Sequence, residues 1–200
     1  MGCRTLSYKE IKGTSRLFRD FLFDFKKVAP YYCADFKDLE RFKAKAPRLA
    51  DNSYSRDELA DILTDQNRDF GLDKKSLANV ERLRDKNSSV VFTGQQVGML
   101  TGPLYTIYKT LTAIKLANHL ESEIGTPVIP IFWLAADDHD FEEVSHVHIL
   151  DQSGKPAKIY YEPVTDPGDV PMGFVKCDSG ISSFVEQVLG MLPKTEFTDD

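Results

Sequence analysis

Two apolar runs frame the middle of the chain, and each has the length of a β-strand. The first is Val90, Val91 and Phe92, and the second is the sequence VIPIFWLA at positions 128–135. Neither run alternates apolar with polar residues, so both predict strands buried on two faces, as in a parallel sheet. We therefore expect a strand at each position, with a helix between them.

Apolar residues at helical spacing predict that helix. They form one stripe, which consists of Leu104, Ile107, Tyr108, Leu111, Ile114 and Leu120. Thr101 or Gly102 is expected to cap the helix start, with Pro103 at the first helical position, and Gly125 and Pro127 are expected to end it. A strand, a helix and a second strand in this order predict a right-handed βαβ unit.

An unusual segment directly follows each predicted strand. The first is TGQQVGMLTGP at positions 93–103, where glycines spaced four apart would let the backbone approach a ligand closely. The second is DDHD at positions 137–140. Parallel strands present their carboxyl ends at one edge of the sheet, and ligands bind beyond that edge. We therefore expect both segments to contribute to one binding site.

The candidate site residues come from these two segments and the helix start. Asp138 and His139 are the expected catalytic residues, because an imidazole oriented by a neighbouring acid can act as a general base. Asp137, Asp138 or Asp140 can pair with an ammonium group. Gln95 or Gln96, with the N–H groups of the turn, can bind an anionic or carbonyl group. The expected substrate-binding residues are Thr93, Gly94, Gln95, Gln96, Gly98, Thr101, Gly102, Tyr105, Asp137 and Asp140.

Structural alternatives stay open for both segments. The glycine-rich segment can be a tight connection only, and DDHD can be a charged loop in solvent that caps the next segment. Neither GxGxxG nor GxxxxGK[ST] occurs in the segment, so the common phosphate-binding fingerprints are absent. Lys109 is expected to face solvent rather than a ligand.

The sequence before the first strand predicts helices of structural character. One contains residues 17–25 and ends at Pro30, and a shorter one is closed by Pro47. Ser55 and Glu58 form a capping box for a third helix, and a fourth ends near Asn87.

The sequence after DDHD predicts a β-hairpin and a last helix. Alternation at 144–149, a turn at 151–154 and a return strand at 158–161 predict the hairpin. Asp178 or Ser179 is expected to start the helix, and Pro193 to stop it. We therefore expect three parts: an N-terminal helical segment (1–88) packed on the core, a βαβ unit (89–140), and the start of an insert (141–200). Two parallel strands do not make a stable domain, so a longer chain is expected.

Composition and charge narrow the class of protein. With 31 acidic and 25 basic residues, the chain lacks the positive surface that nucleic-acid binding requires. No run of 18 apolar residues occurs, so no membrane span is predicted. Three cysteines far apart in the sequence favour a reduced, cytoplasmic setting.

A metal site is not predicted. His146 and His148 face one way if they lie on a strand, but the spacing fixes no third ligand for zinc. Exposed hairpin residues are the favoured interpretation of both histidines.

The sequences TGQQVGMLTGPLYTIYK and PVIPIFWLAADDHDFEEV, in this order, resemble the bacillithiol-biosynthesis cysteine ligase family, BshC. The helical N-terminus and the segment KIYYEP are also similar to that family, so the resemblance covers essentially all 200 residues. Family members are much longer, and the chain is similar to their N-terminal part.

The resemblance implies a Rossmann-like core similar to class I aminoacyl-tRNA synthetases, with connecting inserts and a later coiled-coil domain that forms a homodimer. It implies an activity that joins cysteine to the amine of glucosaminyl-malate, the last step to bacillithiol. The chain departs from the synthetase pattern because it has no HxGH motif. The corresponding turn carries residues 101–105, TGPLY.

The mechanistic hypothesis follows from the chemistry of amide formation. A free carboxylate must be activated, and ATP can convert cysteine into an acyl-adenylate or acyl-phosphate that the sugar amine then attacks. Two alternatives stay open. One is another adenylate-forming ligase or nucleotidyltransferase with a different acceptor, and the other is a non-catalytic module that binds a sugar-acid.

Overall fold

The computed structural model describes residues 5–166, 168–196 and 198. The chain divides into two compact units, one up to Tyr54 and one from Ser55 onward. The division into 1–88, 89–140 and 141–200 stays a prediction. Of the helices that the structure describes, none combines the length and apolar character that a membrane crossing requires.

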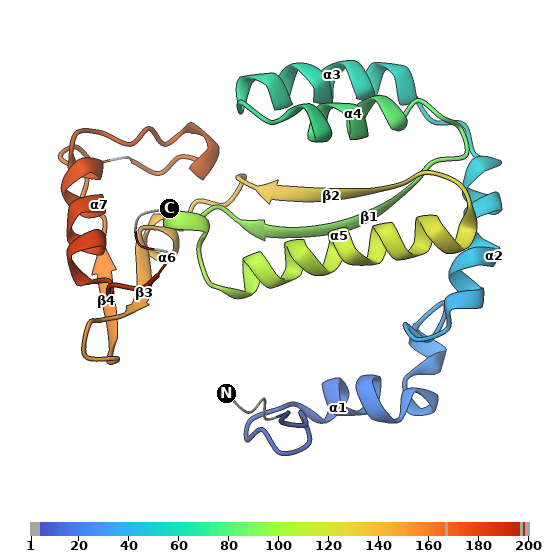
Figure 1. Cartoon of the computed structure of the whole chain (residues 1–200), viewed down its shortest axis with the longest axis horizontal. Coiled ribbons are helices and arrows are strands. Elements are labelled where there is room, and N and C mark those ends of the chain that lie inside the picture. Colours follow the sequence, from blue (N-terminus) through green and yellow to red (C-terminus); the bar gives the residue numbers. More distant parts are fainter. Residues whose placement is uncertain (1–4, 167, 197, 199–200) are drawn as a thin grey trace. The chain divides into compact units, whose positions relative to one another are not determined.

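From residue 5 onward, the N-terminal unit contains the two α-helices α1 (Arg16–Phe23) and α2 (Leu39–Ala50), shown in blue in Figure 1. Two short 3₁₀ turns, Phe25–Lys27 and Ala29–Tyr31, follow α1. The prediction that Pro47 closes the second helix is wrong, because Pro47 lies inside α2. A proline costs a helix one hydrogen bond and a steric clash, but the residues after it can remain helical.

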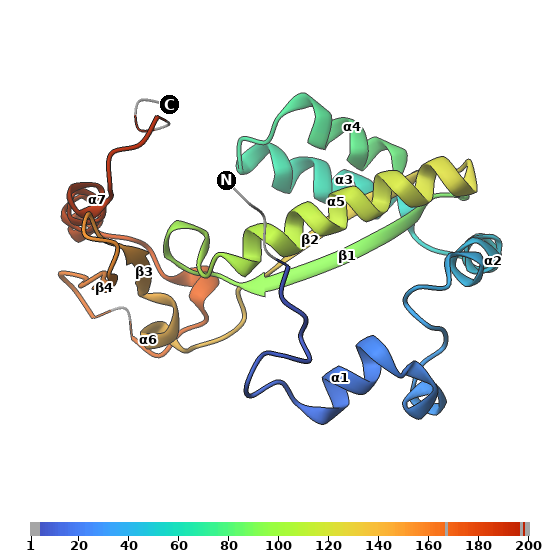
Figure 2. The same ribbon diagram turned by 60° about the horizontal axis from the view of Figure 1, so that its bottom comes forward.

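The second unit is built on a two-stranded parallel sheet of β1 (Ser89–Gln96) and β2 (Val128–Ala135). The register runs from Ser89 opposite Val128 to Gln96 opposite Ala135. Helix α5 (Tyr105–Ile124) connects the strands and packs on both (Figures 1 and 2). The predicted strand, helix and parallel strand are confirmed, so the unit is a mixed α/β structure with a small parallel sheet.

The strands are less buried than predicted. Val90, Phe92 and Trp133 expose 41%, 58% and 61% of their surface, whereas Val128 and Ile129 are buried. A sheet of only two strands offers little area for other elements to pack on, so some of the apolar side chains on its faces stay exposed to solvent. The prediction of strands buried on both faces is therefore wrong for the described chain.

Helix α5 turns a different face to the sheet from the one predicted. Its buried residues are Thr106, Ala113, Ala117 and Leu120. Of the predicted stripe only Leu120 is buried, while Leu104, Tyr108 and Leu111 are exposed. Small residues let the helix approach the strands closely, and alanine contributes little to the apolar periodicity on which the prediction depended.

The ends of α5 test the capping predictions. Gly125 adopts a left-handed conformation (φ 77°) and donates its N–H to the Glu121 carbonyl oxygen at 2.9 Å, which confirms the predicted stop. At the start, Leu104 is the N-cap, and Pro103 lies outside the helix, contrary to the prediction. The segment before it contains a 3₁₀ turn, Met99–Thr101, that delays the helix.

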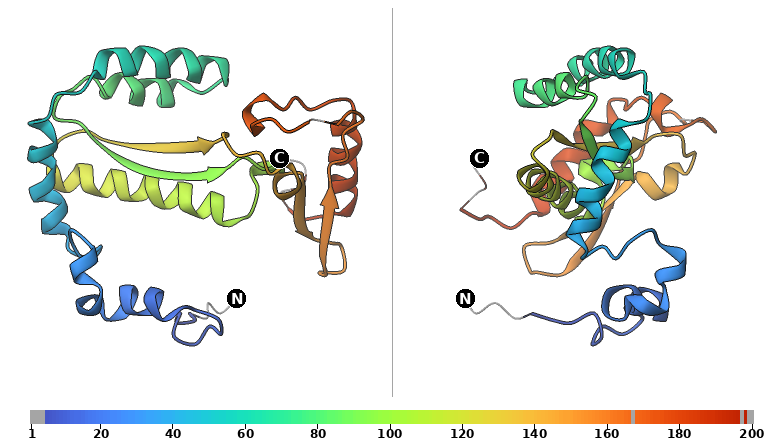
Figure 3. Two further views of the ribbon diagram at one scale, coloured as in Figure 1. Left: turned by 180° about the vertical axis from the view of Figure 1, so that it is seen from behind. Right: turned by 90° about the vertical axis from the view of Figure 1, so that its right-hand side faces the viewer.

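Helices α3 (Arg56–Asp69) and α4 (Lys74–Arg82) pack against each other and lie across the strands from α5 in Figure 1; Figure 3 shows them from two further sides. Ser55 is the N-cap of α3, but its side chain accepts no capping hydrogen bond, so the predicted capping box does not form. Arg56 fixes α3 to the loop before β1. Its guanidinium donates to Ser88 Oγ (2.8 Å) and to the carbonyl oxygens of Leu83 (3.1 Å), Lys86 (3.3 Å) and Ser88 (3.1 Å).

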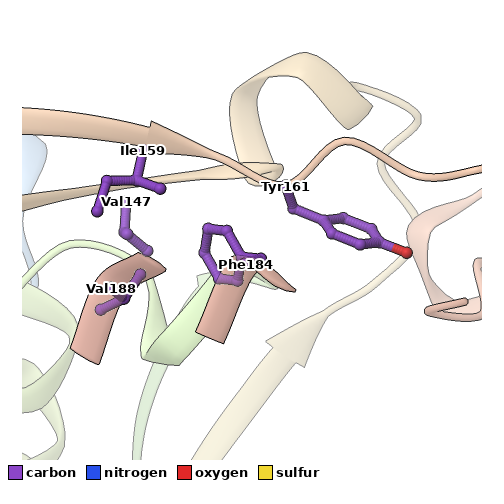
Figure 4. Packing of buried hydrophobic residues seen from close by; sticks show 5 residues of the cluster. All are labelled: Val147, Ile159, Tyr161, Phe184 and Val188. Carbon is purple, nitrogen blue, oxygen red and sulfur yellow. The ribbon is translucent and has the colours of Figure 1, made fainter. Parts of the chain in front are cut away.

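The C-terminal part of the second unit contains the predicted hairpin. After the short helix α6 (Phe141–Val144), strands β3 (His146–Leu150) and β4 (Pro156–Tyr160) pair antiparallel. A 3₁₀ turn, Met172–Phe174, precedes α7 (Gly180–Met191). The hairpin and α7 share a small core, drawn in Figure 4, that consists of Val147, Ile159, Tyr161, Phe184 and Val188.

We predict that Arg56→Lys lowers the free energy of unfolding by about 2 kcal/mol, since a lysine ammonium cannot reproduce the forked set of hydrogen bonds and leaves buried oxygens unpaired. Urea denaturation of the variant and the wild type measures the change. The matched control is Arg68→Lys, whose guanidinium makes one exposed contact with Asp65 and whose loss should stay within about 0.5 kcal/mol. Equal stability of the Arg56 and Arg68 variants would contradict the prediction.

We predict a pH-dependent contribution from Glu121, which joins α5, β2 and α4. The Val128 N–H donates to the Glu121 carboxylate at 2.9 Å and lowers the pKa of Glu121 below its ordinary 4.5. Burial opposes this shift in part, and the Arg82 guanidinium adds to it. A lowered folded-state pKa gives stability that is complete above the ordinary value and is lost as the pH falls through the folded-state value. Glu121→Gln should therefore cost about 1 kcal/mol at pH 7 and almost nothing at strongly acidic pH.

Urea titrations across this pH range check the Glu121 prediction. Glu186→Gln, on the exposed face of α7, is the control and should change stability little at any pH. A Glu121→Gln penalty that does not depend on pH would overturn the assignment.

Candidate functional site

The carboxyl end of β1 carries two consecutive glutamines, Gln95 and Gln96. Successive side chains of a strand point to opposite faces of the sheet. The contacts follow this rule: the Gln95 amide reaches Tyr105 on α5, and the Gln96 amide reaches Asp138 beyond β2. The two predicted segments therefore meet at one edge, but their side chains form two groups, one on each face of β1.

The first group is the pair of Gln96 and Asp138. Gln96 Nε2 donates to Asp138 Oδ2, while Oδ1 accepts the backbone N–H groups of His139 (2.7 Å) and Asp140 (3.3 Å). The Gln96 amide, followed by these two N–H groups, lowers the pKa of Asp138. Asp138 is therefore a carboxylate at neutral pH, partly exposed, and its charge favours a cation such as an ammonium group.

The rest of the DDHD segment has mixed roles. Asp140 caps α6, because its Oδ1 accepts the Glu143 N–H at 2.9 Å. This contact is the structural alternative that the sequence left open for that residue. Asp137 and His139 have exposed side chains. A residue far along the chain also holds the DDHD segment in place, since Met172 donates its N–H to the Asp138 carbonyl oxygen at 2.8 Å.

The second group lies on the α5 face of β1 and includes Lys109. Gln95 Nε2 donates to the Tyr105 hydroxyl at 3.0 Å, and Gln95 Oε1 accepts from Lys109 Nζ at 3.1 Å. Lys109 also donates to the Gly94 carbonyl oxygen. The expectation that Lys109 faces solvent is therefore wrong. The position of Lys109 near the start of α5 could have predicted this direction. Long side chains on a helix point back toward the helix start, and the end of β1 lies there.

An open groove adjoins this second group. It has a volume of about 320 Å³ and is lined by Val91, Phe92 and Thr93 of β1 and by residues of α5 that include Tyr105, Tyr108 and Lys109. Thr93, a predicted substrate-binding residue, thus lies at a hollow surface.

The glycines of the connecting segment have structural reasons for their presence. A Cβ on Gly94 would lie 2.8 Å from the Trp133 carbonyl oxygen of β2, so the close pairing of the strands excludes a side chain there. A Cβ on Gly98 would lie 3.0 Å from the Cα of Gly102, which has a positive φ of 69°. Gly94 thus allows the strands to pair, and Gly98 and Gly102 approach each other within the connection, while a role of these glycines in ligand binding stays a prediction.

Thr101 lies in this connection with an uncommon backbone conformation. Thr101 and Leu100 have positive φ values of 76° and 50°. Non-glycine residues rarely adopt such values, and the conformation costs about 1 kcal/mol or more per residue. The connection between Gln96 and Tyr105 is therefore strained and has a specific backbone shape.

Another group of charged residues lines a hollow in the N-terminal unit. In the N-terminal unit, a hollow of about 430 Å³ is lined by Lys9, Arg19, Asp20, Phe23, Asp24 and Lys27. Three of these charges pair with one another, since Lys27 Nζ lies 2.7 Å from Asp24 and 3.5 Å from Asp20. Among residues 5–166, 168–196 and 198, no three His, Cys, Asp or Glu side chains gather closely enough to hold a metal ion. His146 and His148 lie on β3, with ring centroids 5.1 Å apart.

The comparison with known proteins agrees with the resemblance found in the sequence. A family model described as "Bacillithiol biosynthesis BshC, N-terminal Rossmann-like domain" matches residues 1–200. A relative from Salinibacter ruber is 40% identical over 181 residues, which cover 90% of this chain and 33% of the relative. A relative from Geobacillus thermodenitrificans is 37% identical over 166 residues, which cover 82% of this chain and 30% of the relative. Both are named "Putative cysteine ligase BshC".

These matches place the chain within longer proteins, because it spans about a third of the length of the curated relatives that it matches. The family model covers the whole chain, and the parallel strands with their connecting helix agree with its description. The chain belongs to the BshC family, as its N-terminal Rossmann-like domain.

Proposed function

We propose that the complete protein is a ligase that joins L-cysteine to the amine of glucosaminyl-malate and so forms bacillithiol. The observation that carries the proposal is the carboxylate of Asp138, held by Gln96 at the shared carboxyl edge of two parallel strands. Membership of the BshC family, whose relatives carry the name of a cysteine ligase, supports the same reaction.

The residues at this edge suit a reaction between an acid and an amine. Both amino substrates carry ammonium groups at neutral pH, and an ionised Asp138 attracts such a group. The attacking amine must lose a proton as the amide bond forms. His139 is the proposed proton acceptor, since a neutral imidazole nitrogen can accept a proton and this side chain is exposed beside Asp138.

Activation of the cysteine carboxyl group is the role proposed for ATP. ATP supplies a leaving group on the acyl carbon, which the amine then displaces. Among the described side chains, Lys109 offers a positive charge that favours a polyanion on the α5 face of β1, whereas Asp138 on the other face repels phosphates.

The remaining predicted residues are proposed to shape the substrate site. Asp137 and Asp140 add negative charge around Asp138 and strengthen its attraction for an amine. The connecting segment, which contains Gly98, Thr101 and Gly102, is proposed to contribute backbone groups to the substrate. Thr93, Gly94, Gln95 and Tyr105 are assigned to the α5 face of the same edge.

We also propose the wider setting of the reaction. The Rossmann-like core is proposed to continue as in class I aminoacyl-tRNA synthetases, with a coiled coil that makes the full-length protein a homodimer. The described cysteines, Cys33 and Cys177, are both free and exposed, which suits a reducing compartment such as the cytoplasm.

We predict that Asp138→Asn in the full-length protein lowers kcat/KM for bacillithiol formation about 100-fold, because the amide removes the charge that binds the ammonium group while keeping the side-chain volume. The assay supplies L-cysteine, glucosaminyl-malate and ATP and measures the product by mass spectrometry. Glu143→Gln, a nearby exposed acid, is the control and should retain wild-type activity.

Two results would count against these assignments. Wild-type turnover by Asp138→Asn would remove Asp138 from the site, and wild-type turnover by His139→Ala would remove the proton acceptor. ATP–pyrophosphate exchange driven by another amino acid, with no bacillithiol formed, would instead identify a different adenylate-forming ligase.

A further inference from the structure

Lys109 carries an ammonium group that lies against the end of β1. The residue stands early in α5, and its side chain reaches back to the Gly94 carbonyl oxygen and to Gln95 Oε1. Its Nζ also lies 5.8 Å from the centre of the Tyr105 ring. The groups that hold this cation are therefore all neutral.

The charge of Lys109 forms no ion pair with a carboxylate in the part of the chain that the structure describes. Two other partly covered cations of the same unit do have such partners: Arg82 pairs with Glu121, and Arg84 lies 2.6 Å from Asp61. Neutral oxygens offset only part of the cost of removing a cation from water. An anion beside Lys109 would therefore be bound favourably.

Two hydrogen-bond donors remain available at this point. A lysine ammonium has three N–H groups, and Lys109 uses two of them within the chain. The Tyr105 hydroxyl accepts a hydrogen bond from Gln95, so its own proton is free to donate. One charged and one neutral donor thus contact the same Gln95 amide, and carboxylate and phosphoryl oxygens accept hydrogen bonds from both kinds of donor.

The groove beside these donors provides space for the rest of a ligand. Its volume of about 320 Å³ is within the range of small-molecule sites. Thr93 of β1 lines the same groove and lies two residues before Gln95. Apolar walls from Val91 and Phe92 favour a small organic acid or a nucleotide over a free inorganic ion.

We propose that Lys109 and Tyr105 bind the anionic oxygens of a substrate, either a carboxylate or a phosphoryl group, on the α5 face of β1. This inference rests on the proposed ligase function and adds a second subsite to it, while Asp138 serves the ammonium group on the opposite face. In that reaction the anionic oxygens belong to glucosaminyl-malate, to cysteine or to ATP.

The test measures binding of each ligand alone to the full-length protein by isothermal titration calorimetry. Glucosaminyl-malate, L-cysteine and ATP are titrated separately into the wild type, Lys109→Met and Lys109→Arg. Lys115→Met is the matched control, because Lys115 lies on the same helix with an exposed side chain. Circular dichroism verifies that each variant is folded.

We expect Lys109→Met to weaken at least one of the three ligands about tenfold or more, which identifies the source of the anionic group. Lys109→Arg should retain most of the affinity, and Lys115→Met should stay within about twofold of the wild type. Equal affinities of Lys109→Met and the wild type for all three ligands would overturn the inference. Absence of binding by the wild type would overturn it as well.

A second variant keeps the test decisive if Lys109→Met fails to fold. Tyr105→Phe removes the O–H donor, together with the oxygen that accepts from the Gln95 amide, and should weaken the same ligand about threefold, whereas unchanged affinity would overturn the inference. Failure of the ligase proposal is a separate result, because it appears as a wild-type protein that binds its ligands and forms no bacillithiol.

Discussion

The parallel pairing of β1 with β2 determines where each candidate site residue lies. The register places Gln96 opposite Ala135, so the chain needs only three more residues to bring Asp138 to the Gln96 amide. This pairing requires Gly94, since any side chain there would collide with the backbone of Trp133. Gly94 is thus required for the pairing of the strands, and the site depends on Gly94 because it depends on that pairing.

The end of β1 separates charge between its two faces. The Gln96 face carries a carboxylate with a lowered pKa, and the Gln95 face carries an ammonium group without a carboxylate partner among the described residues. A substrate pair that combines an amine with several acidic groups matches this separation. The sequence predicted one edge with two contributing segments, and the structure adds that neighbouring residues of one strand direct them to different faces.

Local signals in the sequence predicted the elements well. The β-branched and apolar runs located both strands, Gly125 located the end of α5, and the alternation around His146 and His148 located the hairpin. Each depends on conformational preferences of a few adjacent residues, which the sequence contains in full. The proximity of the glutamines and DDHD was predictable for the same reason, because parallel strands place both carboxyl ends together.

Packing was less predictable, because burial depends on what surrounds an element. The buried face of α5 uses Ala113 and Ala117, whereas the larger residues Tyr108 and Leu111 dominated the predicted stripe and lie exposed. Trp133 belongs to a strand that was predicted to be buried, yet two strands provide no second layer over its side chain. The direction of Lys109 was missed because its acceptors, Gly94 and Gln95, lie far away in the sequence and become neighbours only when α5 packs on β1.

The arrangement of this edge of the sheet depends on the hydrogen bond from Gln96 to Asp138, and the pKa of Asp138 tests that bond most directly. Carboxyl carbon chemical shifts, followed by NMR during an acid titration, give this pKa in the wild type and in Gln96→Leu. We predict a pKa below the ordinary aspartate value of 3.8 in the wild type and a clear rise toward it in the variant. An ordinary pKa in the wild type, or the same pKa in both proteins, would contradict the claim.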